Sequence, residues 1–592
     1  MPLRKNEFTI LYSLLRHAGA GPISQRQIAS LCGISLGTVN STLASCRREG
    51  LIDDERKLTA RGTAALEPYK VDNAIIMAAG LSSRFVPLSY EKPKGVLTVR
   101  GEVLIERQIR QLQEAGITDI TVVVGYMKEA FFYLEDMFGV KIAVNREYAK
   151  RNNNSSLHLI RDRLSNTYIC SSDDYFTQNP FEPYVYQAYY SAEFFEGPTD
   201  EYVMEVGPGN RIERVDPNGG ADAWCMIGHA YFDRSFSDAF VAILESEYER
   251  PETAGKLWED IYIDHLRELP MVRRDYPAGT IYEFDSIKDL REFDQDFLEN
   301  VDSAILDNIC GYFGCDRGEL GSIAPIKEGL TNLSFKFGLR GETYVYRHPG
   351  AGTEHLINRA SETFSQQIAR NLGIDSTFVY EDPAEGWKLS RYVEGCAPFD
   401  YGDARQVGEA MRIARILHGA AAESEWSFDV YEKARGIVES LEGRGYPLPP
   451  DFALLEARAS SLHEHVSADG VAPCLCHNDM YGPNFLVHDG GMELIDWEYS
   501  AMGDYASDLG TFICCSGYGF EQAERAIAEY FGREPSPSEL RHCTAYVGLS
   551  SYYWYVWALF KESEGDPVGE WLYLWYRAAK AYGKRALDMY ER

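Results

Sequence analysis

The segment from residue 476 to residue 500, CHNDMYGPNFLVHDGGMELIDWEYS, constrains the fold of this chain more than any other stretch. Residues 485–487 and 492–495 are mainly apolar, and residues 488–491, His-Asp-Gly-Gly, separate them. Two short apolar runs around a Gly-containing turn predict a β-hairpin. Such a hairpin brings the residue before its first strand close to the residue after its second strand.

Three polar side chains are placed around this predicted hairpin. Asp479 lies five residues before Asn484, and Asp496 follows the second strand. Transfer of a γ-phosphoryl group requires a carboxylate that orients the attacking hydroxyl group and oxygen ligands for Mg²⁺, and this Asp-to-Asn spacing is that of a kinase catalytic loop. We therefore expect Asp479 to orient the hydroxyl group and Asn484 and Asp496 to hold Mg²⁺. The alternative is that HND and IDW are ordinary loop and strand residues.

The segment resembles the choline kinase and aminoglycoside phosphotransferase superfamily, in which the catalytic loop is HxDxxxxN and the metal-binding Asp lies in an IDWE-type or IDxE-type strand. The resemblance implies a bilobal, protein-kinase-like fold for residues 298–592, with ATP as a substrate. Residues 326–337 are similar to the phosphate-covering loop of choline kinases, and residues 389–395 correspond to the hinge between the lobes. The nucleotide-binding residues implied in the first lobe are Gly329, Thr331, Asn332, Arg347 and Glu362.

Arg347 takes the position that a Lys has in protein kinases. Its guanidinium group is a bidentate phosphate ligand, so the exchange preserves the function. Glu362 lies on a predicted helix over residues 358–372, where we expect it to pair with Arg347. The alternative for Glu362 is an ordinary surface glutamate.

Aromatic residues crowd the segment SYYWYVWAL, which has a helical pattern. Trp554 and Trp557 are three residues apart and therefore share one helix face. The segment resembles the tryptophan-bearing helix of choline kinases, which implies that Tyr553, Trp554 and Trp557 surround a trimethylammonium group. A core helix is the alternative, because aromatic residues at helical spacing are usually buried.

The segment NAIIMAAGLSSRFVPLSYEKPKGVLTVR, residues 73–100, begins with a buried-strand pattern and continues into a Gly-containing loop. Such a loop exposes backbone N–H groups to phosphate, and Arg84 and Lys94 add positive charge for a leaving pyrophosphate. The segment resembles the signature of sugar-phosphate and phosphocholine nucleotidyltransferases, with Ala79 and Gly80 in the nucleotide loop. It departs from that signature at Ser82, where glycine is usual, and at Gly95.

Residues 70–297 alternate strand and helix patterns, which predicts a Rossmann-like, mostly parallel sheet with its ligand beyond the carboxyl ends of the strands. Asp173 and Asp285 each follow a predicted strand, and the resemblance implies that they hold Mg²⁺. For Asp173 the alternative is a helix or turn cap, and the neighbouring Asp174 is the other candidate ligand. Residues 152–156 resemble the Asn-rich stretch that contacts the nucleotide, with Asn154 as the expected contact. An ordinary loop is the equal alternative for this run.

A quaternary ammonium group is held by aromatic faces and nearby carboxylates. Trp224, Trp258 and Glu283 have this chemistry in the middle domain, as does Glu259. For each tryptophan, burial in the core is the alternative.

Residues 1–69 are expected to form a separate module. Helical patterns over 24–32 and 36–49, separated by Gly-Ile-Ser, predict a helix-turn-helix with Ser35 as an N-cap. A short hairpin follows, so the module resembles the winged helix of bacterial transcription regulators. Residues 1–70 contain ten Lys and Arg against six Asp and Glu, a net charge of +4, whereas the remainder carries −36. Ser41, Arg47 and Arg48 are candidates for DNA phosphate contacts, and self-association is the equal alternative.

Composition bounds the other properties of the chain. Its 592 residues suit about three domains, and a net charge of −32 argues against nucleic acid or an anionic membrane as the main partner. Twelve cysteines without zinc spacing, no signal peptide and no long apolar span predict a cytoplasmic protein.

The two resemblances together imply a bifunctional enzyme like those that serve bacterial phosphocholine decoration. Choline and ATP would give phosphocholine, and phosphocholine and CTP would give CDP-choline and pyrophosphate. One alternative is a pair of enzymes for ethanolamine, another amino alcohol or a sugar. The other is a transcription regulator that senses metabolites through enzyme-like domains. The sequence leaves the oligomeric state open.

Overall fold

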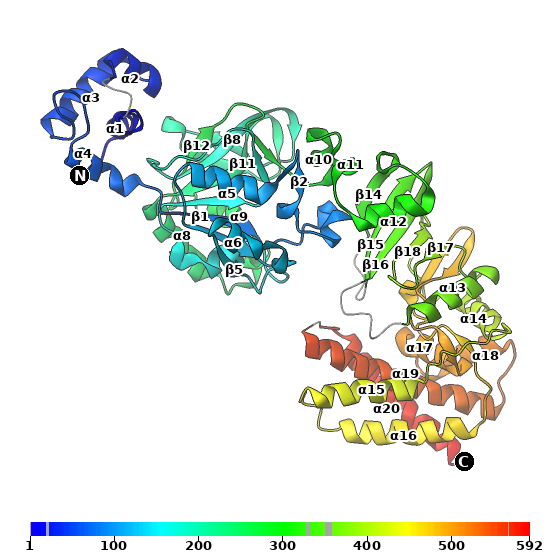
Figure 1. Ribbon diagram of the computed structural model, residues 1–592. Coiled ribbons are helices and arrows are strands. Elements are labelled where there is room, and N and C mark those ends of the chain that lie inside the picture. Colours follow the sequence, from blue (N-terminus) through cyan, green and yellow to red (C-terminus); the bar gives the residue numbers. More distant parts are fainter. Residues whose placement is uncertain (1, 19–22, 327–331, 350–357, 566) are drawn as a thin grey trace. The chain divides into compact units, whose positions relative to one another are not determined.

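A computed structural model describes residues 2–18, 23–326, 332–349, 358–565 and 567–592 (Figure 1). The chain forms two compact units, Met1–Gly318 and Glu319–Arg592. The first unit contains a small helical module and a large mixed sheet. The second contains a small antiparallel sheet followed by a helical part.

The helical module at the start of the first unit has the predicted helix-turn-helix. Ser24 and Ser35 cap the second and third helices, because their hydroxyl oxygens accept hydrogen bonds from Gln27 and Thr38 backbone N–H groups. A bridge between Ile52 and Leu58 forms the short hairpin. The helices are α1 (Lys5–Arg16), α2 (Gln25–Cys32), α3 (Leu36–Arg48) and α4 (Ala60–Leu66).

The large sheet of the first unit has a parallel centre. β1 (Asn73–Ala78) lies between β4 (Ile120–Val124) and β6 (Thr167–Ser171) and is parallel to both, and β4 is parallel to β5 (Lys141–Val144). β1 and β4 are almost fully buried, as their unbroken apolar sequences predict. The carboxyl ends of β1 and β6 therefore lie next to each other, at the edge where a ligand is expected.

The other half of this sheet is antiparallel, so the sheet is mixed. β11 (Gly220–Phe232) runs antiparallel to β6, β8 (Tyr189–Thr199) and β9 (Val203–Val206). β10 (Ile212–Asp216) extends the edge, and β12 (Val272–Asp275) pairs with β8. A separate pair, β7 (Asp174–Phe176) with β13 (Ile281–Glu283), follows β6. The main helices are α5 (Leu104–Glu114), α6 (Tyr133–Phe138), α7 (Asn154–Leu159), α8 (Arg234–Glu247) and α9 (Trp258–Asp264).

Residues 298–318 belong to the first unit, whereas the sequence suggested that the third domain begins at 298. The carboxylate of Glu91 accepts hydrogen bonds from the Ser303 hydroxyl group and the Ile305 backbone N–H, which fixes the start of α12 (Ala304–Phe313). Lys92 Nζ donates to the Asp302 carboxylate at 2.8 Å. These contacts hold the segment on the first unit.

The second unit begins with a five-stranded antiparallel sheet in the order β14-β15-β16-β18-β17. Its strands are β14 (Gly321–Pro325), β15 (Asn332–Leu339), β16 (Glu342–Pro349), β17 (Phe378–Glu381) and β18 (Lys388–Arg391). Helix α13 (Arg359–Asn371) contacts β17. This arrangement is the first lobe that the sequence predicted.

The second lobe is largely helical. Its longest helix, α19 (Pro537–Glu564), contacts α15 (Val430–Gly443), α16 (Phe452–Ala468), α17 (Tyr505–Ser516) and α20 (Trp571–Tyr590), and several of these helices lie alongside one another in Figure 1. The predicted hairpin is present as β20 (Phe485–His488) and β21 (Gly491–Leu494). The remaining helices of this lobe are α14 (Ala404–His418) and α18 (Phe520–Phe531).

Within the residues that the structure describes, no single helix is long and apolar enough to cross a bilayer, and only the bent pair α2 and α3 passes by length and composition. All twelve cysteines are free.

Candidate active sites

The catalytic-loop sequence in the second unit is anchored by a buried carboxylate. Asp508 on α17 accepts hydrogen bonds from the backbone N–H groups of His477 and Asn478, at 2.9 and 2.5 Å. The same carboxylate contacts Nε2 of His418 at 2.9 Å. Asn478 adopts the left-handed conformation, with φ of 64°. The loop is therefore fixed from its backbone, which leaves the side chain of Asp479 available for a ligand.

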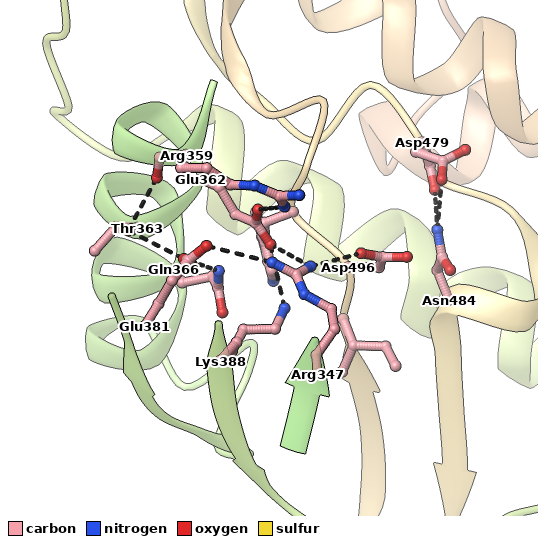
Figure 2. A network of polar contacts seen from close by, with 12 residues as sticks. Arg347, Arg359, Glu362, Thr363, Gln366, Glu381, Lys388, Asp479, Asn484 and Asp496 are labelled. Atoms are coloured by element: carbon pink, nitrogen blue, oxygen red, sulfur yellow. Dashed lines mark hydrogen bonds and ion pairs between the residues drawn. The ribbon is translucent and has the colours of Figure 1, made fainter. Parts of the chain in front are cut away.

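Asp479 and Asn484 are brought together as the hairpin predicted. Asn484 Nδ2 donates to the Asp479 carbonyl oxygen at 2.9 Å and to Asp479 Oδ2 at 2.8 Å (Figure 2). The amide oxygen of Asn484 is then free of this contact and is a hard ligand of the kind that Mg²⁺ prefers. Burial, with Asp496 nearby, raises the pKa of Asp479 well above its usual range. A bound cation would oppose this shift.

Arg347 joins the two lobes around Asp496. Its guanidinium group contacts Glu362 at 2.6 Å, Glu381 at 3.3 Å and Asp496 at 3.5 Å (Figure 2). The expected pairing with Glu362 is therefore present. Asp496 adopts φ of 68° and its side chain is 36% exposed, so it is accessible to a ligand.

Two further cations complete this network, and sequence reasoning did not identify them. Lys388 contacts Glu362 at 3.3 Å, and Arg359 contacts the other oxygen of Glu362 at 3.0 Å (Figure 2). Burial and the negative charge of Glu362 raise the pKa of Glu381 to about 7, whereas the surrounding cations lower the pKa of Glu362. Lys388 and Arg347 both line a cavity of about 550 Å³ together with Asp479 and Asp496.

The side chains of the other three residues predicted to bind nucleotide in the first lobe are not described by the structure. Gly329 and Thr331 lie outside the described residues. Asn332 begins β15, opposite Pro349 of β16, and only its backbone is described. These three assignments stay predictions.

Aromatic rings form one end of the same cavity. Trp554 and Trp557 both line it, and their ring centroids are 5.6 Å apart at an angle of 74°. Tyr499 lies edge-on to Trp554 at 6.0 Å. The helix face predicted from the spacing is therefore directed to the cavity that contains Asp479, and it is not confined to the core.

Two aromatic residues of this wall were missed from the sequence. Trp571 and Trp575 on α20 line the cavity, with Trp575 at 5.7 Å from Trp554 and 5.4 Å from Trp571. Their spacing of four residues on one helix was the available signal. Tyr553 is not among the lining residues. It is 4% exposed and packs against Phe428.

The nucleotidyltransferase signature of the first unit surrounds a second cavity, of about 580 Å³. Ala79, Gly80, Arg84 and Lys94 line it, beyond the carboxyl ends of β1 and β6. Lys94 pairs with the buried Asp173, and Arg84 pairs with Asp285 at 2.9 Å. Burial alone would lower the pKa of Lys94, but the Asp173 carboxylate outweighs it and raises that pKa.

Asp173 and Asp174 have distinct surroundings. Asp173 contacts Lys94 and the Ser171 hydroxyl group, whereas Asp174 accepts from the Ser171 backbone N–H and lies in β7. Desolvation raises the pKa of Asp174 well above its usual range. Asp173 is therefore the one that pairs with Lys94 of the cavity wall, although neither carboxylate itself lines the cavity.

The two departures from the signature have structural reasons. Ser82 adopts φ of 55°, a conformation that favours glycine, which accounts for the usual residue at this position. Gly95 lies so close to Ser172 that a Cβ atom there would be 2.8 Å from the Ser172 Cβ. In this loop a serine therefore adopts the left-handed conformation at position 82, and a glycine allows the close approach to Ser172 at position 95.

The Asn-rich stretch contacts the cavity through residues other than the predicted one. Asn154 is fully buried and donates to the carbonyl oxygens of Thr253 and Lys256, so it does not reach the cavity. Asn152 and Asn153 line the cavity instead. The start of α7 buries the third asparagine of the run, which the sequence alone does not reveal.

Four residues were predicted as candidates to hold an ammonium group in this unit. Trp258 and Glu283 line the cavity, where the Trp258 ring stacks on Tyr190 with centroids 5.8 Å apart. Glu259 lies beside them, and desolvation raises its pKa to about 7. Trp224 is not brought to the cavity, because its ring packs against Phe194 and under the guanidinium group of Arg273.

Three family models match successive parts of the chain. Residues 12–80 match the wHTH-PRTase associated family, residues 74–177 match the MobA-like NTP transferase domain, and residues 322–543 match the phosphotransferase enzyme family. Each model falls on the part of the chain where the corresponding motif was found.

Individual relatives match the NTP transferase part of the chain over most of their own length. The chain is 32% identical to choline-phosphate cytidylyltransferase of Streptococcus pneumoniae over 222 residues, which are 38% of this chain and 96% of the relative. The chain belongs to the cytidylyltransferase family. It is also 34% identical to 2-aminoethylphosphonate cytidylyltransferase of Lancefieldella rimae, over 38% of this chain and 93% of that relative. Among solved structures, choline kinase LicA from Streptococcus pneumoniae is 25% identical over 47% of this chain and 98% of that chain, with a TM-score of 0.42.

The cytidylyltransferase is thus joined to a phosphotransferase in one chain. Both halves use nucleotides, and each has one of the two cavities described above.

Proposed function

We propose that the second unit phosphorylates choline with ATP, and that the cytidylyltransferase of the first unit couples the phosphocholine to CTP and releases pyrophosphate. The observation that carries this proposal is the cluster of four tryptophans in the same cavity as Asp479. An aromatic wall beside a catalytic carboxylate suits a cationic alcohol, whose hydroxyl group must reach the carboxylate.

The chemistry of this cavity favours a methylated ammonium group. A cation over an aromatic face gains about 0.5–2 kcal/mol per ring, depending on its desolvation. The lining also contains Glu498 and Tyr499, which follow Asp496 in the segment after β21. The carboxylates compensate the positive charge of the ligand, and the rings provide the large apolar surface that its methyl groups contact.

Mg²⁺ is expected at both sites. In the second unit, Asn484 and Asp496 offer oxygen ligands beside Asp479, and Arg347 and Lys388 would contact the ATP phosphates. In the first unit, Asp173, Glu283 and Asp285 offer carboxylate oxygens near Lys94 and Arg84. Such oxygen donors are the ligands that Mg²⁺ prefers. The metal would neutralise phosphate charge at each site.

The second reaction requires in-line attack of a phosphate oxygen on the α-phosphorus of CTP. Lys94 and Arg84 supply positive charge where pyrophosphate leaves. Trp258, Tyr190 and Glu259 would face the ammonium group of phosphocholine. The first unit therefore repeats the combination of aromatic ring and carboxylate found in the second.

The presence of a kinase bears on the choice between the two relatives' substrates. A phosphonate has a carbon–phosphorus bond, which no kinase forms, so a cytidylyltransferase for 2-aminoethylphosphonate gains nothing from an attached kinase. A phosphate ester of an amino alcohol is the substrate that the kinase can supply. Phosphoethanolamine is therefore the second candidate, because it meets this condition without using the aromatic wall.

The proposal is tested by following phosphorus species by NMR in a mixture of the protein, choline, ATP, CTP and Mg²⁺. We expect phosphocholine to appear first and CDP-choline with pyrophosphate to follow. A parallel mixture with ethanolamine is expected to react more slowly at the kinase step. Equal rates for choline and ethanolamine would contradict the choline assignment, and the absence of both phosphocholine and phosphoethanolamine would contradict the kinase assignment.

Replacing Trp557 with leucine is expected to raise the KM for choline about tenfold, because one cation–π contact is removed. The KM for ATP and the rate with saturating choline are expected to change little. Trp426, whose ring packs on Phe364 outside the cavity, is the matched control for a Trp-to-Leu exchange. An equal loss of affinity for choline and ethanolamine in the Trp557 variant would exclude a methyl-selective role for the ring.

We also propose that the winged helix binds DNA or another copy of the chain. Arg47 is partly engaged by Asp54, at 3.4 Å, whereas Ser41 and Arg48 face solvent on α3.

A further inference from the structure

A third cavity, of about 490 Å³, lies between the winged helix and the large sheet of the first unit. One wall is α1, through residues from Lys5 to His17. The opposite wall is the segment 182–189, which leads into β8, together with β12. Neither active site includes these residues.

Hydrogen bonds and ring stacking at the edge of the cavity join its two walls. Val185 N donates to the Tyr69 carbonyl oxygen at 2.8 Å, and Lys70 forms a β-bridge with Tyr184. The Tyr186 hydroxyl group donates to the Leu3 carbonyl oxygen at 3.2 Å, and the Tyr186 ring stacks on Tyr69 with centroids 5.6 Å apart. The cavity is thus enclosed by a packed interface between the two modules.

The charge of this cavity is opposite to that of the active sites. Four cationic side chains and two carboxylates line it: Lys5, Arg16, Arg273, Arg274, Glu182 and Asp275. The cytidylyltransferase cavity has three cations and five carboxylates, and the kinase cavity has three cations and four carboxylates. An excess of carboxylates suits a metal-bound nucleotide, whereas an excess of cations suits an anion without a metal. This excess is notable in a chain with a net charge of −32.

The cations are only partly neutralised by their neighbours. Glu182 is shared between Arg274 at 3.3 Å and Arg16 at 3.8 Å. Arg273 is paired with Asp275 at 2.7 Å. Lys5 has no ion-pair partner within the described part of the chain. Positive charge is therefore available to a ligand from both walls of the cavity.

Aromatic faces lie beside this charge. Tyr184 and Tyr186 are half-buried in the cavity wall, and the Tyr12 ring lies 5.6 Å from Tyr184. The Arg274 guanidinium group lies over the Tyr189 ring at 4.8 Å. Stacking on an aromatic ring and contact with guanidinium groups are the two interactions that a nucleoside phosphate requires when no metal is bound.

We propose that this cavity binds a nucleoside phosphate without a metal ion, with the phosphates near Lys5, Arg16 and Arg274 and the base against the tyrosines. The ligand would contact the winged helix and the cytidylyltransferase at once, so its binding would strengthen the interface between them. This gives the winged helix a role in sensing nucleotide within the chain.

The test is calorimetric titration of the full chain with CDP in the presence of EDTA, which withdraws the metal that the carboxylate-rich active sites need. We expect one binding site per chain. The double variant Lys5→Ala and Arg16→Ala is expected to weaken this binding about tenfold or more, because two charge-assisted contacts are lost. The double variant Arg26→Ala and Arg61→Ala removes the same charge from exposed positions of the same module outside the cavity and is expected to bind CDP normally.

Three results would overturn the proposal. The first is no binding of CDP in EDTA, and the second is equal affinity in the two double variants. The third is a loss of this binding in Lys94→Gln, which would place it in the cytidylyltransferase cavity. Titration with pyrophosphate separates the two parts of the ligand: weaker binding than CDP supports stacking of the base, and equal binding contradicts it. None of these measurements requires turnover, so they are independent of the choline assignment.

Discussion

Replacing Asp479 with asparagine is expected to lower the rate of choline-dependent ADP release by about 10²–10⁴-fold, the usual contribution of a positioned general base. The exchange preserves the shape of the side chain and its contact with Asn484, which holds it at 2.8 Å. What it removes is the carboxylate that accepts the proton of the attacking hydroxyl group. Release of ADP in a coupled assay measures the loss.

The same variant provides its own internal control. Its cytidylyltransferase is intact, so added phosphocholine and CTP are expected to give pyrophosphate at the rate of the unchanged protein. Asp489→Asn is the matched substitution, because Asp489 is exposed in the turn of the same hairpin. A decrease of less than tenfold for Asp479→Asn would assign the catalytic carboxylate elsewhere in the cavity, to Asp496 or Glu498.

The features that were predictable from sequence are those set by local spacing. Asp479 and Asn484 are five residues apart, and the hairpin that follows pairs two adjacent short strands, from Phe485 with Leu494 to His488 with Gly491. The meeting of Asp479, Asn484 and Asp496 is therefore encoded within about twenty residues. Ser35 as an N-cap is equally local, because the cap bonds to a residue three positions later.

The features that were missed depend on contacts between distant segments. Lys388 lies opposite Arg347 because β18 pairs with β16, and both cations contact Glu362 of α13. Trp571 and Trp575 reach the cavity because α20 packs along α19. No spacing in the sequence specifies these pairings, and the tryptophans of α20 stand only in a helical pattern that a core helix shares.

Asn154 and Trp224 were misplaced for a related reason. The sequence does not distinguish the three consecutive asparagines. The start of α7 turns the third one inward, where it donates to the carbonyl oxygens of Thr253 and Lys256. Trp224 is on a long strand whose alternation directs its ring to Arg273. In both cases the residue type was suitable, and the direction of the side chain decided the outcome.

Replacing Lys94 with glutamine is expected to stop the pathway at phosphocholine. The raised pKa of Lys94 keeps its ammonium group charged at neutral pH, in the wall of the cavity where pyrophosphate would leave. Removing one preorganised charge of this kind lowers a rate by about 10²–10³-fold. Glutamine can still donate a hydrogen bond to Asp173, so the buried carboxylate keeps a polar partner.

Phosphorus NMR of the complete reaction distinguishes the possible outcomes for this variant. Phosphocholine is expected to accumulate at the normal rate while CDP-choline is formed slowly. Lys92→Gln is the control, because Lys92 lies two residues away and pairs with the exposed Asp302 at 2.8 Å, outside the cavity. Because loss of a buried ion pair can unfold a domain, the thermal unfolding of both variants is compared first. A folded Lys94→Gln protein that makes CDP-choline within threefold of the normal rate would mean that Arg84 and the metal neutralise the leaving group without Lys94.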